Sequence, residues 1–275
     1  MPRGLEGKVA IVTGGAQSLG KAAAETLAGY GVKVAIADIN IDGAEATAAI
    51  IRENGGQAMA VETDVSEEEQ VKAMTDAVVA AYGPIEILYN NAAILDADMR
   101  DHDRDVASMR VDIWDKAMAV NLRGAMLCSK YALKSMISQK SGSIIFATSG
   151  LGVMGDATRS AYAASKAGVI MLSKSIATQY GELGIRSNAI QIGFVLGDNA
   201  EKNTPQEIKD ILLANHLTPY LGSPQHIADV VAFLASDEAA FVTGHTLAAD
   251  GGFTAHTPSL TAMKEFFRKI GTNKM

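Results

Sequence analysis

The stretch KVAIVTGGAQSLG, residues 8–20, sets the pattern that the whole chain follows. Its first part, Lys8 to Thr13, is a short run rich in β-branched residues, which is typical of a buried strand. Gly14 and Gly15 stop this run, and a helix-like segment follows from about Leu19 to Tyr30. The stretch therefore predicts a strand, a glycine turn and a helix, with the turn placed where the phosphates of a nucleotide would meet the free amides of a helix N-terminus.

The same alternation continues along the chain. Further strands are expected at 32–37, 58–61, 85–89, 142–147, 185–192 and 245–249, and further helices at 42–54, 66–82, 112–136, about 159–182 and 224–235. Ser66 and Glu69 have the spacing of a capping box at the start of the helix that ends near residue 82. Alternating strands and helices require crossover connections, so we predict an α/β fold, a doubly wound parallel sheet of the Rossmann type with helices on both faces. Ligands of such sheets bind at the carboxyl ends of the strands.

One domain accounts for residues 1–275 better than two, because α/β folds often exceed the usual domain length. Residues 193–222 interrupt the alternation with Gly and Pro and are interpreted as a substrate lid. Residues 254–275 form a C-terminal extension, and its apolar positions from 260 to 270 have helical spacing. The loop at 95–110 is crowded with Asp and Arg and is interpreted as a solvated connector.

Composition excludes several kinds of partner. The net charge is -7 and no run of Lys and Arg occurs, so we expect no nucleic-acid partner. Cys128 is the only cysteine, which rules out an intramolecular disulfide. We find neither a secretory signal nor an apolar run long enough to span a bilayer, and the five histidines lack the spacing of metal ligands. The expectation is a cytoplasmic protein with no membrane partner and no catalytic metal.

Three polar residues have the arrangement of an acid/base device. Tyr162 and Lys166 are four residues apart, so on a helix their side chains share one face. Ser149 lies at the end of a predicted strand and would face this pair. Moving a tyrosine pKa from about 10 to about 7 takes roughly 4 kcal/mol, which one cation at about 4 Å can supply. We therefore expect Lys166 to lower the pKa of Tyr162, while Ser149 holds a substrate oxygen and Tyr162 exchanges its proton.

The end of the second strand carries the signal for cofactor choice. Asp38 follows Gly20 by eighteen residues, close to the spacing expected for an acidic residue that binds the adenosine ribose. A 2′-phosphate would meet this carboxylate at close range, and the neighbours Gly15 and Ile39 offer no compensating cation. The residues therefore favour NAD over NADP. Several other polar or small residues fall at or just past predicted strand ends, namely Gly14, Asp64, Asn91, Ser149 and Ile192.

From about Leu5 to Phe253 the chain resembles the short-chain dehydrogenase/reductase family. The matching pieces are TGGAQSLG at 13–20, Asp38, Asp64-Val65, NNAA at 90–93, Asn121, Ser149, Tyr162 with Lys166, and Asp250-Gly251-Gly252. The resemblance implies an enzyme that transfers a hydride reversibly between the secondary alcohol group of a small-molecule substrate and a nicotinamide ring. The NAD preference makes oxidation the favoured direction.

The resemblance also implies a role for each matching residue. Tyr162 would be the general acid/base, Ser149 would position the substrate oxygen, and Lys166 would lower the Tyr162 pKa and hold the nicotinamide ribose. Asn121 would secure a water that links Lys166 to solvent. The implied cofactor contacts are Gly14, Gln17, Ser18, Leu19, Gly20, Asp38, Ile39, Asp64, Val65, Asn91, Ala92, Tyr162, Lys166, Ile192 and Val195. The family likeness further implies a homotetramer, with the helices at 112–136 and 159–182 as interfaces and with Ala161, Ala164 and Gly168 allowing close approach.

Four positions depart from the family pattern. Ser18 stands in place of a glycine of the phosphate loop, and Ala93 in place of the last glycine of NNAG. Ile192 replaces the usual proline before Gly193. Gly197 occupies a position often held by a threonine that contacts the nicotinamide carboxamide.

The expected walls of the substrate pocket are residues 95–111, 150–159 and 193–222. Their apolar residues, among them Leu151, Val153, Phe194 and Leu217, predict an apolar substrate that is cyclic or aromatic. Three alternatives stay open. A ketone or 3-oxoacyl reductase of the same fold would want NADPH and conflicts with Asp38, a non-redox enzyme could retain bound NAD, and a nucleotide-sensing protein would not need the acid/base set.

Overall fold

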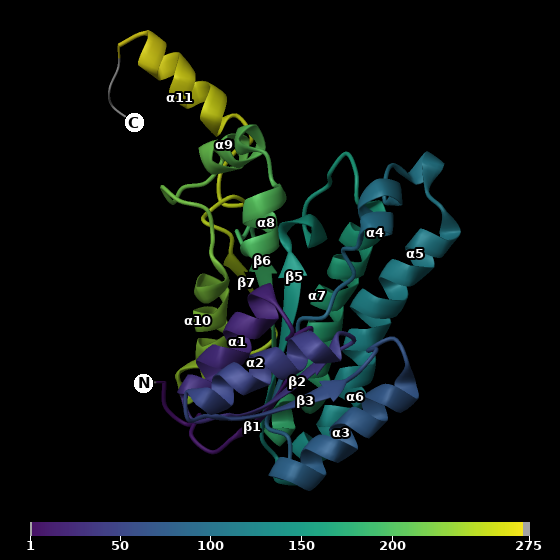
Figure 1. The fold of residues 1–275 in the computed structure, drawn as a ribbon. Helices are drawn as coiled ribbons and strands as arrows, with labels where there is room; N and C mark the ends of the chain where they lie inside the picture. Colours follow the sequence, from purple (N-terminus) through teal and green to yellow (C-terminus); the bar gives the residue numbers. More distant parts are fainter. Residues whose placement is uncertain (1, 272–275) are drawn as a thin grey trace.

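The computed structural model describes residues 2–271. Seven parallel strands form one sheet in the order β3-β2-β1-β4-β5-β6-β7. They are β1 (Val9–Thr13), β2 (Lys33–Asp38), β3 (Gln57–Glu62), β4 (Ile87–Asn90), β5 (Gly142–Ser149), β6 (Ile185–Ile192) and β7 (Thr246–Ala249). Helices cover both faces of the sheet, as Figure 1 shows, and the predicted doubly wound α/β fold is confirmed.

The helices between the strands follow the predicted alternation closely. They are α1 (Ser18–Gly29), α2 (Ile41–Glu53), α3 (Glu68–Tyr82), α4 (Ala97–His102), α5 (Val111–Ala117), α6 (Ala125–Gln139), α7 (Ser160–Tyr180), α8 (Asp198–Asn203), α9 (Gln206–Ala214), α10 (Pro224–Ala235) and α11 (Leu260–Lys269). Short 3₁₀ turns occur at Val106–Ser108, Gly150–Gly152, Gly181–Leu183 and Asp237–Ala239, and a π-helical turn, η2, at Met118–Gly124.

Each strand divides its side chains between two helical layers. In β1, Ala10 and Val12 pack in the core that includes α1, α2 and α10, whereas Val9 and Ile11 pack in the core that includes α3, α6 and α7. This alternation arises because successive side chains of a strand point to opposite faces. A parallel sheet covered on both faces needs apolar residues on both, which explains why VAIV is apolar throughout.

The parallel register brings the ends of the central strands together at two opposite edges. We use the name carboxyl edge for the ends of β1, β2, β4, β5 and β6, where Thr13, Asp38, Asn90, Ser149 and Ile192 lie. The amino edge is the opposite end, where these strands begin. Ser149 of β5 is paired in register with Ile192 of β6, so the two loops that follow leave the sheet side by side.

The helix predicted over 112–136 is confirmed as a continuous helical stretch, made of α5, the π-helical turn η2 and α6. Two other expectations about local structure were wrong. The capping box does not form, because α3 begins at Glu68 and the Ser66 hydroxyl instead donates to Asp64 Oδ1 at 2.7 Å. The loop at 95–110 contains α4 and a 3₁₀ turn. Residues 193–222 include α8 and α9, and their role as a lid stays a prediction, as does the single domain over 1–275.

The C-terminal extension forms α11, which projects beyond the sheet layers and lies next to α9 (Figure 1). The Thr261 hydroxyl donates to Ala214 O at the end of α9, and His256 Nε2 lies 2.7 Å from Asn215 O. None of the α11 side chains is buried. Residues 272–275 of this extension lie outside the described range.

Two searches of residues 2–271 concern membranes and metals. No helix in this part of the chain combines the length and the apolar character needed to cross a membrane. Within the same range, no three His, Cys, Asp or Glu side chains gather closely enough to hold a metal ion.

Candidate active site

The glycine turn after β1 brings backbone close to backbone. Gly14 has φ of +65°, and a Cβ at this position would lie 2.9 Å from Ala92 Cα. A Cβ at Gly20 would lie 2.1 Å from Gly14 O, so the turn can close against α1 only with glycine there. The first turn of α1 carries no acidic side chain. The N-terminal amides of α1 therefore face the carboxyl edge in a form suited to bind phosphate.

Asn91 fixes this turn against β4. Its Nδ2 donates to Thr13 O at 3.1 Å and to Gly14 O at 2.9 Å. The Thr13 hydroxyl in turn accepts from the backbone N–H groups of Asn91 and Ala92 at 3.0 and 3.1 Å. Asn91 and Ala92, predicted as cofactor contacts, thus also hold the shape of the cofactor turn.

Two carboxylates stand beside the turn at the ends of β2 and β3. Asp38 Oδ2 accepts from Ala16 N at 3.0 Å and its Oδ1 from Asn40 N at 2.9 Å, so the carboxylate is held against the glycine turn. Asp64 Oδ1 accepts from both the N–H and the hydroxyl of Ser66. The neighbour of Asp38, Ile39, is 68% exposed and brings no charge. A ribose hydroxyl could donate to a carboxylate placed in this way.

Ser18 and Gly197 face each other across the same turn. Ser18 has φ of +49°, a conformation that glycine adopts more readily than serine. A Cβ at Gly197, which precedes α8, would lie 2.5 Å from Ser18 Oγ. The two departures from the family pattern are therefore in contact, and the serine hydroxyl fills the space that a side chain at 197 would need.

Tyr162, Lys166 and Ser149 are brought together as predicted. Ser149 ends β5, and its Oγ accepts from Leu151 N at 3.2 Å. Tyr162 is half-buried in the first turn of α7, and its phenol lies near enough to the Ser149 hydroxyl for that hydroxyl to act on the Tyr162 pKa. Burial raises the pKa of Tyr162, while the Ser149 hydroxyl and the positive charge of Arg159 oppose this rise. The structure thus places the phenol and the strand-end hydroxyl within bonding reach at the carboxyl edge.

Lys166 does not act on Tyr162 in the way expected from sequence. Its Nζ lies 5.6 Å from the centroid of the Tyr162 ring and donates to Ala147 O at 2.9 Å. The side chain is 3% exposed, and burial lowers the pKa of Lys166 to about 8. The expectation that Lys166 brings the Tyr162 pKa near 7 differs from this arrangement, in which desolvation dominates both residues.

Asn121 connects three segments from within the π-helical turn. Its Oδ1 accepts from Ile94 N at 2.9 Å, and its Nδ2 donates to Ser165 Oγ at 3.0 Å. Ser165 donates in turn to Tyr162 O at 2.7 Å. The sequence singled out Asn121 but not the widened turn that aims it, a kind of helix irregularity that often occurs at functional sites.

Asp103 is a residue of the site that sequence reasoning missed. It is 3% exposed, and its two oxygens accept from Ala161 N at 2.9 Å and from Tyr162 N at 3.0 Å. The interpretation of the loop at 95–110 as a solvated connector was therefore wrong at this position, because one carboxylate of the loop caps the helix that carries Tyr162. The abundance of Asp in the loop was the available signal, but it did not single out this residue.

Small residues of α7 serve packing within the chain. Ala161 is buried in a cluster with Met99, Ile113 and Ala117, and a Cβ at Gly168 would lie 2.7 Å from Leu122 Cδ2. At the end of β6, Ile192 is buried in the sheet. Val195, just after it, forms an isolated β-bridge with Gly222. The remaining predicted contacts, Gln17, Leu19 and Val65, lie at the start of α1 and just after β3.

The carboxyl edge thus offers a matched donor and acceptor set. The start of α1 and the Asp38 carboxylate lie beside the glycine turn, and the hydroxyls of Tyr162 and Ser149 lie close together at the end of β5. This set fits a dinucleotide and an alcohol or carbonyl group next to it.

Comparisons with known proteins agree with this geometry. Residues 14–254 match the family model described as enoyl-(acyl carrier protein) reductase. The chain is 38% identical to cis-4-hydroxycyclohexanecarboxylate dehydrogenase of Sinomonas cyclohexanicum over 90% of this chain and 97% of that one. It is 35% identical to 7alpha-hydroxysteroid dehydrogenase of Bacteroides fragilis, over 93% and 97%. The crystal structure of gox2181 superposes with a TM-score of 0.86 at 31% identity, covering 91% of this chain and 97% of that chain.

Proposed function

The chain belongs to the short-chain dehydrogenase/reductase family, whose members act on CH–OH groups with a nicotinamide cofactor, and from this premise we propose that it oxidises a cyclic secondary alcohol to a ketone with NAD. The observation that carries the proposal is the approach of the Tyr162 phenol to the Ser149 hydroxyl at the carboxyl edge, at the start of α7 and the end of β5. A proton acceptor at this edge supports proton exchange with a substrate hydroxyl next to the cofactor.

In the proposed reaction, a bound nicotinamide ring would accept the hydride. Ser149 holds the substrate oxygen by a hydrogen bond, and Tyr162 takes the hydroxyl proton as the C–H bond breaks and the C=O bond forms. Lys166 Nζ lies 5.6 Å from the centroid of the Tyr162 ring, and in this step its charge would favour the phenolate, against the burial that raises the Tyr162 pKa. Asn121 and Ser165 keep the first turn of α7 in place.

Asp38 supports NAD as the cofactor. Its carboxylate is held against the glycine turn by Ala16 N, and the exposed neighbour Ile39 has no charge. A 2′-phosphate at this place would face a like charge without a compensating cation, at a cost on the order of several kcal/mol. A ribose hydroxyl would instead donate to the same carboxylate.

Apolar side chains on the expected walls support a cyclic, apolar substrate. Leu95, Val153 and Leu217 come from the three wall segments, and each is more than half exposed. Two relatives act, by their names, on a hydroxylated cyclohexane ring and on a hydroxysteroid. A ring that packs against the wall residues would cover them from water.

The direction of the reaction has a second candidate. The description of the matching family model is that of a reductase, which favours reduction of a ketone or 3-oxoacyl group. Such reductases normally use NADPH, and the Asp38 carboxylate would repel the 2′-phosphate of that cofactor. Initial rates in both directions, with NADH and NADPH supplied in turn, decide between them.

The test of the proposed function is NADH formation from NAD, and NADPH formation from NADP, with a panel of cyclic secondary alcohols. We expect turnover with NAD, and a loss of about 10³-fold in kcat for Tyr162→Phe, since a general acid/base contributes roughly 10² to 10⁴. Thermal melting should show that the variant stays folded. Binding of NAD without reduction under any of these conditions would favour a non-redox or nucleotide-sensing protein.

The assembly and the cellular location are further proposals. We propose a homotetramer in the cytoplasm, and exposed apolar residues such as Phe241, Met263 and Phe266 support an assembly that covers them. Gel filtration with light scattering tests the assembly. A monomer with full activity would contradict it.

A further inference from the structure

His256 lies where the C-terminal extension meets the segment that we interpret as a substrate lid. Its Nε2 lies 2.7 Å from the backbone O of Asn215, the residue that ends α9, and its Nδ1 lies 2.9 Å from the backbone O of Thr257. A carbonyl oxygen can only accept a hydrogen bond, so each of the two oxygens requires an N–H group from the ring. The imidazolium, with a proton on both nitrogens, satisfies both oxygens at once.

The two helices on either side of this contact have little support from the core. Neither α9 nor α11 has a buried side chain, and α11 lies next to α9 at the far end of the molecule (Figure 1). Segments with few buried apolar contacts open locally at a low free-energy cost. Hydrogen bonds between the extension and the end of α9 therefore decide how firmly both helices are held.

Thr261 makes a second connection between the same segments. Its hydroxyl lies 3.1 Å from Ala214 O and 3.0 Å from Asn215 Oδ1. A threonine hydroxyl keeps its proton across the physiological pH range, whereas an imidazole does not. The extension is thus joined to the end of α9 by one contact that titrates and one that does not.

The surroundings of the His256 ring favour its charged form. The carbonyl groups of Thr257 and Asn215 raise the pKa of His256. Slight desolvation and the charge of Lys264, on α11, oppose this rise, while the charge of Asp250, just after β7, adds to it. The direction of the shift agrees with the geometry, in which both ring nitrogens face acceptors.

Two other titratable groups lie near this contact. Hydrogen bonds from Thr254 outweigh burial and hold the pKa of Asp250 below its usual value, so Asp250 keeps its charge near neutral pH. His216, the residue after Asn215, is 5% exposed, and its Nδ1 lies 2.6 Å from Leu212 O. A pH-dependent change at this contact must therefore be assigned between His256 and His216, which the experiment below does.

We propose that His256 is a pH-sensitive latch, whose protonated ring ties the C-terminal extension to the end of α9 and whose deprotonation loosens both helices. A neutral ring has one N–H group, so it cannot keep both bonds, and one oxygen then faces a lone pair. The proposal goes beyond the proposed function. It concerns the substrate site because Leu217, on an expected wall, lies two residues after Asn215.

The sign of the pH effect follows from the raised pKa of His256. A group whose pKa is raised by folded-state contacts adds stability that is fully present below its ordinary pKa, here 6.5. This stability is lost as the pH rises through the raised value. The latch is therefore closed in acid and loosens as the pH rises above 6.5.

Hydrogen exchange of the full-length chain at pH 5.5 and pH 8.5 tests the latch. Mass spectrometry gives protection factors, which correct for the effect of pH on intrinsic exchange. In peptides that cover 206–217 and 260–271, we expect protection to fall about 3- to 10-fold from the lower to the higher pH, the size of one net hydrogen bond.

Two variants assign this fall to one residue. In His256→Gln the side-chain amide can donate to one carbonyl at either pH, so the difference between the two pH values should disappear. Thr261→Val is the matched control, because it removes the connection that does not titrate. It should lower protection at both pH values and keep the difference between them.

An NMR titration provides the second measurement. The ring signal that is lost in His256→Gln should titrate in the wild type with a midpoint above 6.5. A midpoint at or below 6.5, or wild-type protection that does not change with pH, overturns the proposal. A pH difference that persists in His256→Gln also overturns it, because His216 or another group would then be responsible. None of these outcomes bears on the proposed function, since no turnover is measured.

Discussion

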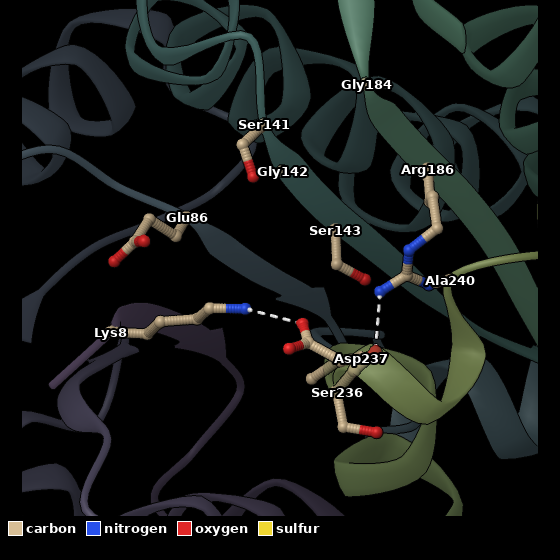
Figure 2. Close-up of a pocket in the computed structure, with 11 residues that line it drawn as sticks. Lys8, Glu86, Ser141, Gly142, Ser143, Gly184, Arg186, Ser236, Asp237 and Ala240 are labelled. Atoms are coloured by element: carbon tan, nitrogen blue, oxygen red, sulfur yellow. Dashed lines mark hydrogen bonds and ion pairs between the residues drawn. The ribbon is translucent and has the colours of Figure 1, made fainter. Parts of the chain in front are cut away.

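Lys166 and Arg186 are two cations of the central sheet region, one beside the carboxyl edge and one at the amino edge. Arg186 donates to Leu234 O at 2.8 Å and to Ser236 O at 3.1 Å, and it lines a cavity of about 70 Å³ in which Lys8 lies 3.7 Å from Asp237 (Figure 2). Lys166 is buried with one carbonyl as its hydrogen-bond partner. Among the side chains that the structure describes, which leave out those of residues 198 and 199, no carboxylate forms an ion pair with it.

The comparison shows how one sheet divides stability and chemistry between its edges. At the amino edge, donors and acceptors from β1, β4, β5 and β6 satisfy one another, as when Glu86 Oε2 accepts from Val9 N at 3.1 Å. At the carboxyl edge, burial works against the charged forms of Lys166 and Tyr162 and shifts the pKa of both. Functional sites commonly hold groups in such costly states, and the rest of the fold offsets the cost.

The sharpest test of this contrast is Lys166→Met. Because burial lowers the pKa of Lys166 to about 8 from 10.5, the folded state binds fewer protons than the unfolded state between these values. The wild type is therefore destabilised below pH 8 and recovers about 3 kcal/mol as the pH rises to 10.5. We expect Lys166→Met to be more stable than the wild type at pH 7 but inactive, with the stability difference shrinking toward pH 10.5. Urea denaturation at several pH values measures this, and a difference that does not change with pH would falsify the account.

The same kind of substitution at the amino edge should have the opposite effect on stability. Arg186→Met removes two hydrogen bonds from a charged donor and leaves Leu234 O and Ser236 O without that partner. We expect a loss of about 2 to 3 kcal/mol in the free energy of unfolding. The kcat/KM should stay within about 2-fold of the wild type, because Arg186 lies at the opposite edge from Tyr162. A large loss of activity with unchanged stability would break the division between the edges.

A smaller effect is expected where Ser18 meets Gly197. Gly197→Thr introduces a Cβ at 2.5 Å from Ser18 Oγ, and overpacking of this kind costs about 1 to 3 kcal/mol. Ser18→Gly removes the obstructing hydroxyl, so the double variant should regain most of the stability and of the NAD affinity that the single Gly197→Thr variant loses. Thermal melting measures the stability, and fluorescence titration with NAD measures the affinity. Additive losses in the double variant would show that the two residues are not coupled.

The smallest stability effect belongs to Asp103. Asp103→Ala removes the cap of α7 and should lower the free energy of unfolding by about 1 kcal/mol. Because Tyr162 N is one of the capped amides, kcat should fall as well, by about 10-fold, with little change in the KM for NAD. Asp105→Ala is the matched control, since Asp105 caps the nearby 3₁₀ turn at Val106–Ser108 instead. Equal kcat values in the two variants would show that Asp103 acts on stability alone.

The alternation of strands and helices and the position of the carboxyl edge could be read from the sequence, because they depend on local patterns. β-branched runs that end in Gly, Asp or Ser gave strand ends within one or two residues, as for Ile185–Ile192. The residue pair Tyr162 and Lys166 could be placed on one helix from their spacing alone.

What escaped prediction depends on contacts between segments distant in sequence. The burial of Asp103 against α7 joins residues almost 60 positions apart, and nothing in the loop distinguishes this aspartate from its exposed neighbours. The raised pKa of Tyr162 likewise follows from how deeply the fold buries it, which spacing does not reveal. Ser18 and Gly197 each depart from the family pattern in sequence, and only the structure shows that these two residues lie in contact.

The π-helical turn at Met118–Gly124 has a consequence for how this chain is aligned with others. A π turn holds more residues than an α turn, and each residue of an α-helix advances the direction of the side chain by roughly 100°. A chain that lacks the extra residue must place its gap inside this turn for Asn121 to match the residue that faces Ser165. A gap set in the loop before α5 pairs Asn121 with a residue on another side of the helix. Phylogenies and designed consensus sequences built on such an alignment would then misassign this position.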